Sequence, residues 1–197
     1  MLKFLRCVVV ALMLMPTIGA AQDFQAGLAA YDTGDYATAL SEWRPFAEQG
    51  YAPAQFNLGL MYDNGQGVLQ DYAEAVKWYR LAAEQGNAQA QSNLAFMYGN
   101  GQGVLQDYAE AMRWNRLAAG QGNAQAQYNL GVMYANGQGV VQSYVIAHMW
   151  FNIAAANGDR KAFEKRDLTA SRMTAEAIVE AQQRASVCMN SGYQDCD

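Results

Sequence analysis

Histidine and cysteine are scarce in this sequence, and their scarcity limits the chemistry that it can carry. His148 is the only histidine among 197 residues, so a serine or cysteine nucleophile has a single possible imidazole base. Three cysteines with no histidine beside them fall short of the usual four ligands of a structural zinc site. The sequence therefore predicts no catalytic residue, no metal site and no cofactor.

A long hydrophobic run is also missing, apart from a short one near the start. Cys7 to Met15 is apolar, with Lys3 and Arg6 before it and small residues after it. This pattern is typical of a secretory signal, and the run is shorter than the ~20 residues that cross a bilayer. We expect a signal peptide over residues 1–21, a mature chain with no integral membrane segment, and a periplasmic or secreted location.

Basic side chains are few as well. Lysine and arginine number 13 against 18 aspartates and glutamates, which gives a formal charge of −5. Loss of Lys3 and Arg6 with the signal peptide moves the charge to −7. An acidic chain with no run of basic residues offers nothing to phosphate backbones or anionic lipids, so we expect no nucleic-acid partner.

The predicted export of the protein affects the interpretation of its other two cysteines. Once Cys7 is removed, Cys188 and Cys196 are left, close together in the C-terminal tail. In an oxidising compartment such a pair predicts one disulfide that pins the C-terminus.

Three copies of one unit fill the middle of the chain. The copies close with Gly86, Gly122 and Gly158, which are 36 residues apart. Each copy contains an Asn-Leu pair, a Met-Tyr pair, the string Asn-Gly-Gln-Gly-Val, a tyrosine and a tryptophan. A fixed period of about 20 to 50 residues is typical of a solenoid, in which each unit buries its apolar face against its neighbours.

Each unit predicts two helices joined by a glycine turn. Asn87 and Asn123 are expected N-caps of first helices, and Asn64-Gly65 suits the end of one. Asp71 and Glu74 have capping-box spacing, which predicts the start of a second helix that ends at the closing glycine.

The two ends of the chain differ from the repeats. Helices are predicted over residues 24–31 and 36–49, with a kink at Pro45. Residues 160–172 are predicted to be helical, and a last helix capped by Thr174 is expected to run to Val187. Residues 159–197 would then form the polar cap that an array needs.

Residues that suggest chemistry have simpler structural explanations. The Gly65-Gln66-Gly67 string lacks a preceding strand and a P-loop lysine, so a turn between helices is favoured over a phosphate site. Capping is favoured over catalysis for the acidic residues at the starts of second helices, Asp71, Glu74, Asp107 and Glu110. Packing is favoured over a ligand cage for the three periodic tryptophans, Trp78, Trp114 and Trp150. His148 takes the repeat position of Val76 and Met112, which favours a core or groove histidine over a metal ligand.

The repeated unit reads Ala-x-x-Asn-Leu-Gly-x-Met-Tyr, followed by Asn-Gly-Gln-Gly-Val, Asp-Tyr-Ala-Glu-Ala, a tryptophan and Ala-Ala. This motif resembles the Sel-one-like repeat, a relative of the tetratricopeptide repeat. The likeness is strong over residues 51–158 and loose over 24–50. It weakens in the third copy, where Ser143, Val145 and Ile146 replace Asp, Ala and Glu. The resemblance implies antiparallel helix pairs and a protein-binding adaptor, often bacterial and exported, and it supplies no catalytic residues.

The first helix of the unit has one constant side and one variable side. At 100° per residue, the positions that differ between copies lie on a separate side from those that are the same. We expect the constant side, with Ala54, Leu58 and Met61, to build the core. The variable side is predicted to line a concave groove for an extended or helical peptide; its members are Phe56, Leu60, Ser92, Phe96, Tyr128 and Val132.

Two alternatives stay open for this face. The variable side chains could instead pack between neighbouring first helices or against the final helix. The asparagines at the edge of the constant side, Asn57, Asn93 and Asn129, could bind a peptide backbone, although hydrogen bonding between repeats is favoured.

We therefore expect an all-α superhelical solenoid of antiparallel helix pairs with a C-terminal helical cap. After the signal peptide it comprises a tetratricopeptide-like opening pair (22–50), three repeats (51–86, 87–122 and 123–158) and capping helices with a disulfide tail (159–197). The predicted function is non-catalytic binding of a protein or peptide in the bacterial envelope. Competing functions are a secreted factor for host contact and a β-lactam-binding or cell-wall enzyme; relatives of the latter kind carry a cysteine pair in each repeat, which this chain lacks.

Overall fold

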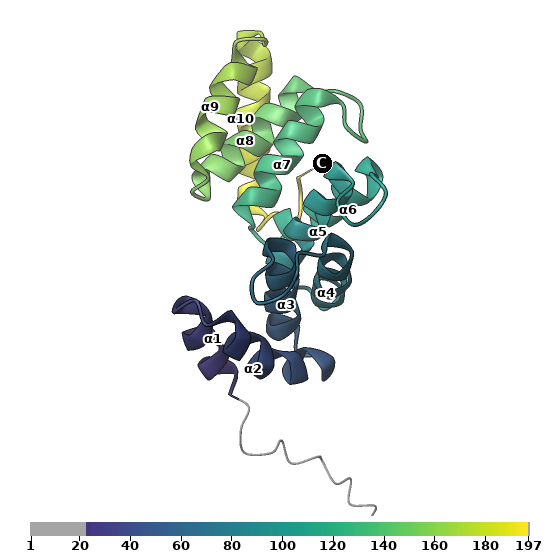
Figure 1. Ribbon diagram of the computed structural model, residues 1–197. Helices are drawn as coiled ribbons and strands as arrows, with labels where there is room; N and C mark the ends of the chain where they lie inside the picture. The colour runs from purple at the N-terminus through teal and green to yellow at the C-terminus, as the bar shows by residue number, and fades with distance from the viewer. Residues whose placement is uncertain (1–22, 197) are drawn as a thin grey trace, which may run out of the picture.

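Helices alone form the regular structure of residues 23–196, the part of the chain that the computed structural model describes. The predicted signal peptide lies outside these residues. The ten helices follow one another along a stack of pairs, with consecutive pairs side by side (Figure 1). They are α1 (Phe24–Asp32), α2 (Tyr36–Glu48), α3 (Ala52–Asn64), α4 (Tyr72–Glu84), α5 (Ala88–Asn100), α6 (Tyr108–Ala119), α7 (Ala124–Asn136), α8 (Tyr144–Ala156), α9 (Arg160–Ala170) and α10 (Ala175–Asn190).

Each repeat is one hairpin of helices, and its ends are set by the residues that the sequence indicates. The side chains of Asn87 and Asn123 accept backbone hydrogen bonds at the starts of α5 and α7. Gly65 ends α3 in the left-handed conformation, with φ of 68°, which glycine adopts without the penalty of a Cβ atom. Asp71 caps α4 by accepting from the amides of Ala73 and Glu74. These predicted caps are confirmed.

One detail of the caps differs from the predictions. The carboxylate of Glu74 bonds forward to Lys77 at 2.7 Å, so the acidic residue of the expected capping box serves an ion pair. In the opening pair, α2 contains Pro45 and ends at Glu48, which agrees with the predicted helix to within one residue; the kink at Pro45 stays a prediction.

The constant side of the first helices forms the core, as expected. The leucines and methionines at equivalent positions are buried in all three repeats. Beside them lies a glutamine that is also buried in each repeat. Gln91 donates to the carbonyl of Ala83 in α4 at 3.0 Å and accepts from Gln121, after α6, at 2.8 Å. Gln55 and Gln127 make the same two bonds in the other repeats.

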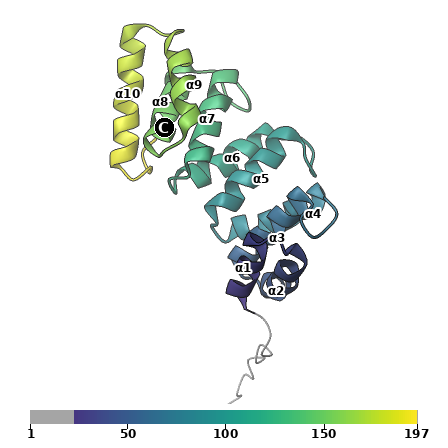
Figure 2. The same cartoon turned by 60° about the vertical axis from the view of Figure 1, so that its left-hand side comes forward.

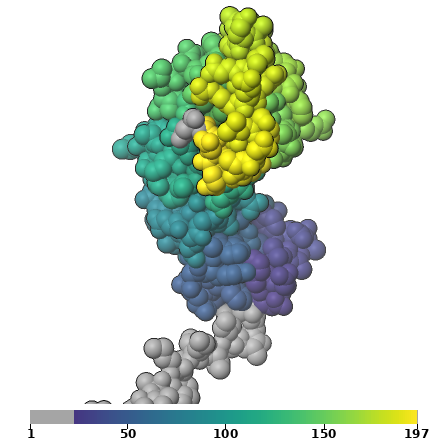
Figure 3. All heavy atoms as spheres, turned by 180° about the vertical axis from the view of Figure 1, so that it is seen from behind, coloured from purple at the N-terminus to yellow at the C-terminus, as the bar shows by residue number. Residues whose placement is uncertain are grey.

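The C-terminal helices cover the end of the stack in an arrangement of their own. Both α9 and α10 pack mainly against α8 rather than against each other, and α10 forms one edge of the molecule (Figure 2). The predicted disulfide joins Cys188 to Cys196. The tail beyond α10 lies over the second repeat (Figure 3), with Tyr193 close to Gly122. No helix of residues 23–196 is long and apolar enough to cross a membrane.

Candidate functional site

Two aromatic residues of the predicted groove pack against the second helix of their own repeat. The ring of Phe56 lies 6.1 Å from the ring of Tyr79 between centroids, and the ring of Tyr128 lies 5.7 Å from that of Phe151. Both are partly buried. Part of the variable side therefore packs within the stack, which was the alternative to an open groove.

The other members of the variable side separate into a buried residue and an exposed one. Ser92 is only 4% exposed, so its prediction as a groove surface is corrected: it lies in the interior. Phe96, one helical turn further along α5, is 55% exposed. Leu60 and Val132, which occupy the same repeat position as Phe96, are partly buried.

A glycine under an aromatic ring is a recurring feature of this fold. A Cβ atom on Gly59 would lie 2.5 Å from Cδ1 of Tyr79, and one on Gly131 would lie 2.6 Å from Cδ1 of Phe151. Glycine is thus required where the first helix approaches the ring on the second helix. The opening pair has the same relationship between Gly27 and Trp43.

The middle repeat replaces both partners of this pair. Ala95 stands where its neighbours have Gly59 and Gly131, and Asn115 stands where they have Tyr79 and Phe151. The residue that would pack on the ring changes with them, from phenylalanine or tyrosine to Ser92. The middle repeat therefore has a small polar side chain in the space that an aromatic ring fills in the others.

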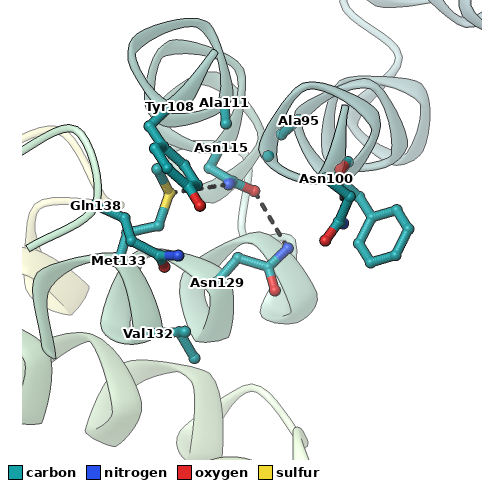
Figure 4. Close-up of a pocket in the computed structure, with 11 residues that line it drawn as sticks. Ala95, Asn100, Tyr108, Ala111, Asn115, Asn129, Val132, Met133 and Gln138 are labelled. Carbon is teal, nitrogen blue, oxygen red and sulfur yellow. Dashed lines mark hydrogen bonds between the residues drawn. The ribbon is translucent and has the colours of Figure 1, made fainter. Parts of the chain in front are cut away.

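A pocket of about 130 Å³ lies at this place, between α5, α6 and α7. Of the residues predicted for the groove, it brings together Phe96 and Val132; Phe56, Leu60, Ser92 and Tyr128 do not line it. Asn129, from the predicted asparagine ladder, lies in its wall. Figure 4 shows the polar ends of Tyr108, Asn115, Asn129 and Gln138 around one hollow.

Asn115 is the most buried polar group of the pocket, at 3% exposure. Its amide nitrogen donates to the sulfur of Met133 at 3.6 Å, and its oxygen accepts from Asn129 at 3.4 Å (Figure 4). The second bond confirms that Asn129 joins neighbouring repeats. A thioether is a weak acceptor, and 3.4 Å is long for an amide hydrogen bond. The amide of Asn115 is therefore only weakly satisfied by the protein.

Gln138 differs from its counterpart in the first repeat. Gln66 accepts from the hydroxyl of Tyr31 at 2.7 Å and donates to that of Tyr36 at 3.1 Å. Within residues 23–196, the side chain of Gln138 makes no hydrogen bond of this kind. Its amide is free to bond to a molecule in the pocket.

The pocket walls carry no formal charge. Its lining consists of alanine, glycine, valine, methionine, asparagine, glutamine and aromatic residues. Burial of an ion without a partner is costly, so these walls favour a neutral polar group over an ammonium or a carboxylate.

A second hollow of about 130 Å³ lies between α7, α8 and α9. Val132 lines this hollow as well as the pocket of the middle repeat. Its other walls include Tyr144, Lys165 and Arg172. The two hollows therefore share one wall residue, Val132 of α7.

The other residues considered for chemistry, His148 and the periodic tryptophans Trp114 and Trp150, lie in the protein interior. His148 is buried, and burial, together with the nearby Arg166 guanidinium, lowers its pKa. Trp114 and Trp150 are buried in the core, in keeping with the predicted packing role. Among the described residues, no three histidine, cysteine, aspartate or glutamate side chains gather as a metal site would require.

Asn115 and Gln138 were missed as site residues in the sequence. The signal was present for Asn115, because the three copies read Tyr79, Asn115 and Phe151 at one position. The signal lies in the second helix of the unit, outside the first-helix positions that predict the groove.

Known proteins support the resemblance seen in the motifs. Residues 52–87, 88–123 and 124–159 match the Sel1 repeat, and no curated protein matches the chain significantly. The chain is 40% identical to a protective antigen present in uropathogenic Escherichia coli strains that displays an SLR fold, with a TM-score of 0.73. That match covers 86% of this chain and 37% of the antigen.

A Sel1 repeat protein from Oxalobacter formigenes is 34% identical, with a TM-score of 0.70, over 75% of this chain and 59% of that one. This chain thus spans less than two thirds of either solved relative. Because the repeat matches more than half of its length and solved relatives share its helix stack, the chain belongs to the Sel1 repeat family.

Proposed function

We propose that this protein is a non-catalytic adaptor that binds a peptide segment of a partner protein along α5 and α7. The observation that carries the proposal is the exposed ring of Phe96 at the rim of the first hollow, which shares Val132 with the second hollow. An exposed aromatic ring next to side-chain-sized pockets is a common anchor for a protein partner. Membership of a repeat family of protein-interaction scaffolds favours the same role.

Five of the six predicted groove residues keep a part in this proposal. Phe96 and Val132 would contact the peptide directly. Leu60 would extend the surface toward the first repeat, while Phe56 and Tyr128 support it through their ring contacts with α4 and α8. Ser92 contributes no surface.

A selection experiment tests the proposal. The mature chain, residues 22–197, is immobilised and challenged with a displayed library of random twelve-residue peptides. Affinities of enriched peptides are then measured by fluorescence anisotropy for wild type, Phe96→Ala and Leu105→Ala. Leu105 is the matched control, because it is 91% exposed in the loop of the same repeat but does not line either hollow.

We expect Phe96→Ala to weaken binding at least tenfold, as for a central aromatic anchor, and Leu105→Ala to leave it unchanged. Equal loss in the two variants, or failure to enrich any peptide, would contradict the proposal.

We further propose that the protein works in the periplasm or outside the cell. The Cys188–Cys196 disulfide supports this, because such bonds persist in oxidising compartments. The solved relative described as a protective antigen also favours an exposed location. Fractionation of cells that produce the full chain should place it outside the cytoplasm, at the mass of residues 22–197. Recovery from the cytoplasm at full length would overturn the assignment.

A further inference from the structure

We propose that the pocket of the middle repeat binds a primary carboxamide, the side chain of a glutamine or asparagine in the bound peptide. This inference rests on the proposed peptide-binding function and adds to it the chemistry of one subsite. It starts from the replacement of the glycine and aromatic pair by Ala95 and Asn115.

The size of the pocket suits one side chain. In the repeats on either side, the rings of Tyr79 and Phe151 occupy the corresponding space. Replacement of a ring by Asn115 leaves a hollow of about 130 Å³. This is well below the ~300 Å³ at which pockets for cofactors and drug-sized ligands begin. A single protruding side chain is therefore the better match.

The hydrogen-bonding groups of the pocket select the chemistry of that side chain. Asn115, Asn129 and Gln138 each carry both a donor and an acceptor, and they lie around the same hollow (Figure 4). The amide of Asn115 has only the sulfur of Met133 and a long bond from Asn129 as partners. A ligand that also has both a donor and an acceptor can complete these bonds, and the carboxamide of a glutamine or asparagine side chain carries both in one plane.

Because the pocket walls carry no charge, the pocket should not bind the acids that match these amides in shape. Glutamate and aspartate match the shape of glutamine and asparagine, but a carboxylate would lose water without gaining a charged partner in the pocket. An aliphatic side chain would fit the volume but would leave the buried amide of Asn115 poorly bonded. The pocket should therefore discriminate between glutamine, glutamate and leucine.

The position of the pocket favours a side chain of a longer chain over a free small amide. It opens next to the exposed ring of Phe96 and adjoins the second hollow at Val132. A peptide that crosses α5 and α7 would contact Phe96 and place one side chain between these helices.

The chain itself provides a design for the test. The double variant Ala95→Gly with Asn115→Phe reproduces the pair found in the third repeat and fills the pocket. The peptide selection is run in parallel on wild type and on this variant, and thermal unfolding monitored by circular dichroism confirms that both are folded. We expect wild type to enrich peptides with glutamine or asparagine at one position, and the variant to bind peptides without that enrichment.

A second measurement keeps the inference testable if the double variant does not fold. The best wild-type peptide is resynthesised with its glutamine or asparagine changed to the matching acid, to leucine or to alanine, and each is titrated into wild-type protein. We expect each change to weaken binding by about tenfold, the effect of one or two lost hydrogen bonds. Unchanged affinity, or the same enrichment in the filled variant, would overturn the carboxamide site and leave the groove proposal intact. Failure of wild type to select any peptide would instead contradict the proposed function.

Discussion

The hydroxyl of Tyr193 donates a hydrogen bond of 2.9 Å to the side chain of Asn157, which lies 36 residues earlier, at the end of α8. Asn157 in turn donates to the buried Gln127 at 2.8 Å. The Cys188–Cys196 disulfide closes the loop that presents Tyr193. The C-terminal tail is therefore linked to the same polar contacts that join the repeats.

Opening the disulfide should loosen this end of the stack. Because the bond limits the freedom of the unfolded tail and holds Tyr193 in place, Cys188→Ser with Cys196→Ser is expected to lower the free energy of unfolding by about 2 kcal/mol. Urea unfolding measures the change. Tyr193→Phe is the control, since it removes only the hydroxyl. No difference between the disulfide variant and wild type would mean that the tail does not support the stack.

Gly59→Ala should destabilise the protein by about 1–3 kcal/mol. Its Cβ would lie 2.5 Å from the buried ring of Tyr79, and such overpacking strains a core. Gly99→Ala is the matched control, because the nearest atom to its Cβ would be 3.8 Å away and alanine favours the helix. Thermal unfolding should rank Gly59→Ala below wild type and Gly99→Ala at or above it.

The same pair offers a rescue experiment. Adding Tyr79→Asn to Gly59→Ala reproduces the combination of the middle repeat, Ala95 with Asn115, and should relieve the clash. If the double variant were no more stable than expected from the two single changes added together, the coupling between these positions would be refuted.

Gln91→Ala should cost about 1–3 kcal/mol of stability. The change leaves the carbonyl of Ala83 and the amide of Gln121 without their partner between two repeats, and an unsatisfied buried polar group carries its full desolvation penalty. Gln89→Ala, on an exposed position of the same helix, should have little effect. Equal effects of the two variants in urea unfolding would show that the buried glutamine does not join the repeats.

The helices and their ends could be predicted from the sequence because they depend on local residues. Asn87 and Gly65 act on the backbone next to them, and the 36-residue period repeats those local signals. The exposure of side chains could not be predicted in the same way. Ser92 and Phe96 are neighbours on one side of α5, yet Ser92 is buried and Phe96 is not, because the helices packed around α5 decide what is covered.

The pocket depends on a relationship between helices. Asn115 becomes a pocket residue only because Tyr79 and Phe151 fill the equivalent space in the repeats before and after it. The angular positions of side chains on one helix do not depend on the ring that faces it from the next helix. Comparison of the second helices between copies would have marked position 115.

The protein should lose stability as the pH falls through the range in which histidine titrates. Burial, and after it the charge of Arg166, lowers the pKa of His148 below its ordinary value of 6.5, although Asp167 opposes this. The unfolded chain therefore binds a proton more readily than the folded one below about pH 6.5. His148→Met, which copies Met112 of the preceding repeat, should reduce the fall in unfolding free energy between pH 7.5 and about pH 5.5. An identical pH dependence in both proteins would contradict a neutral buried histidine.

Nuclear magnetic resonance of the ¹⁵N-labelled chain with a selected peptide tests the central claim most directly. A peptide bound along α5 and α7 should shift the amide signals around Phe96 and Val132 and the side-chain amides of Asn115, Asn129 and Gln138. Shifts confined instead to the exposed loop residues Leu69, Leu105 and Val141 would place the partner on another face and contradict the account.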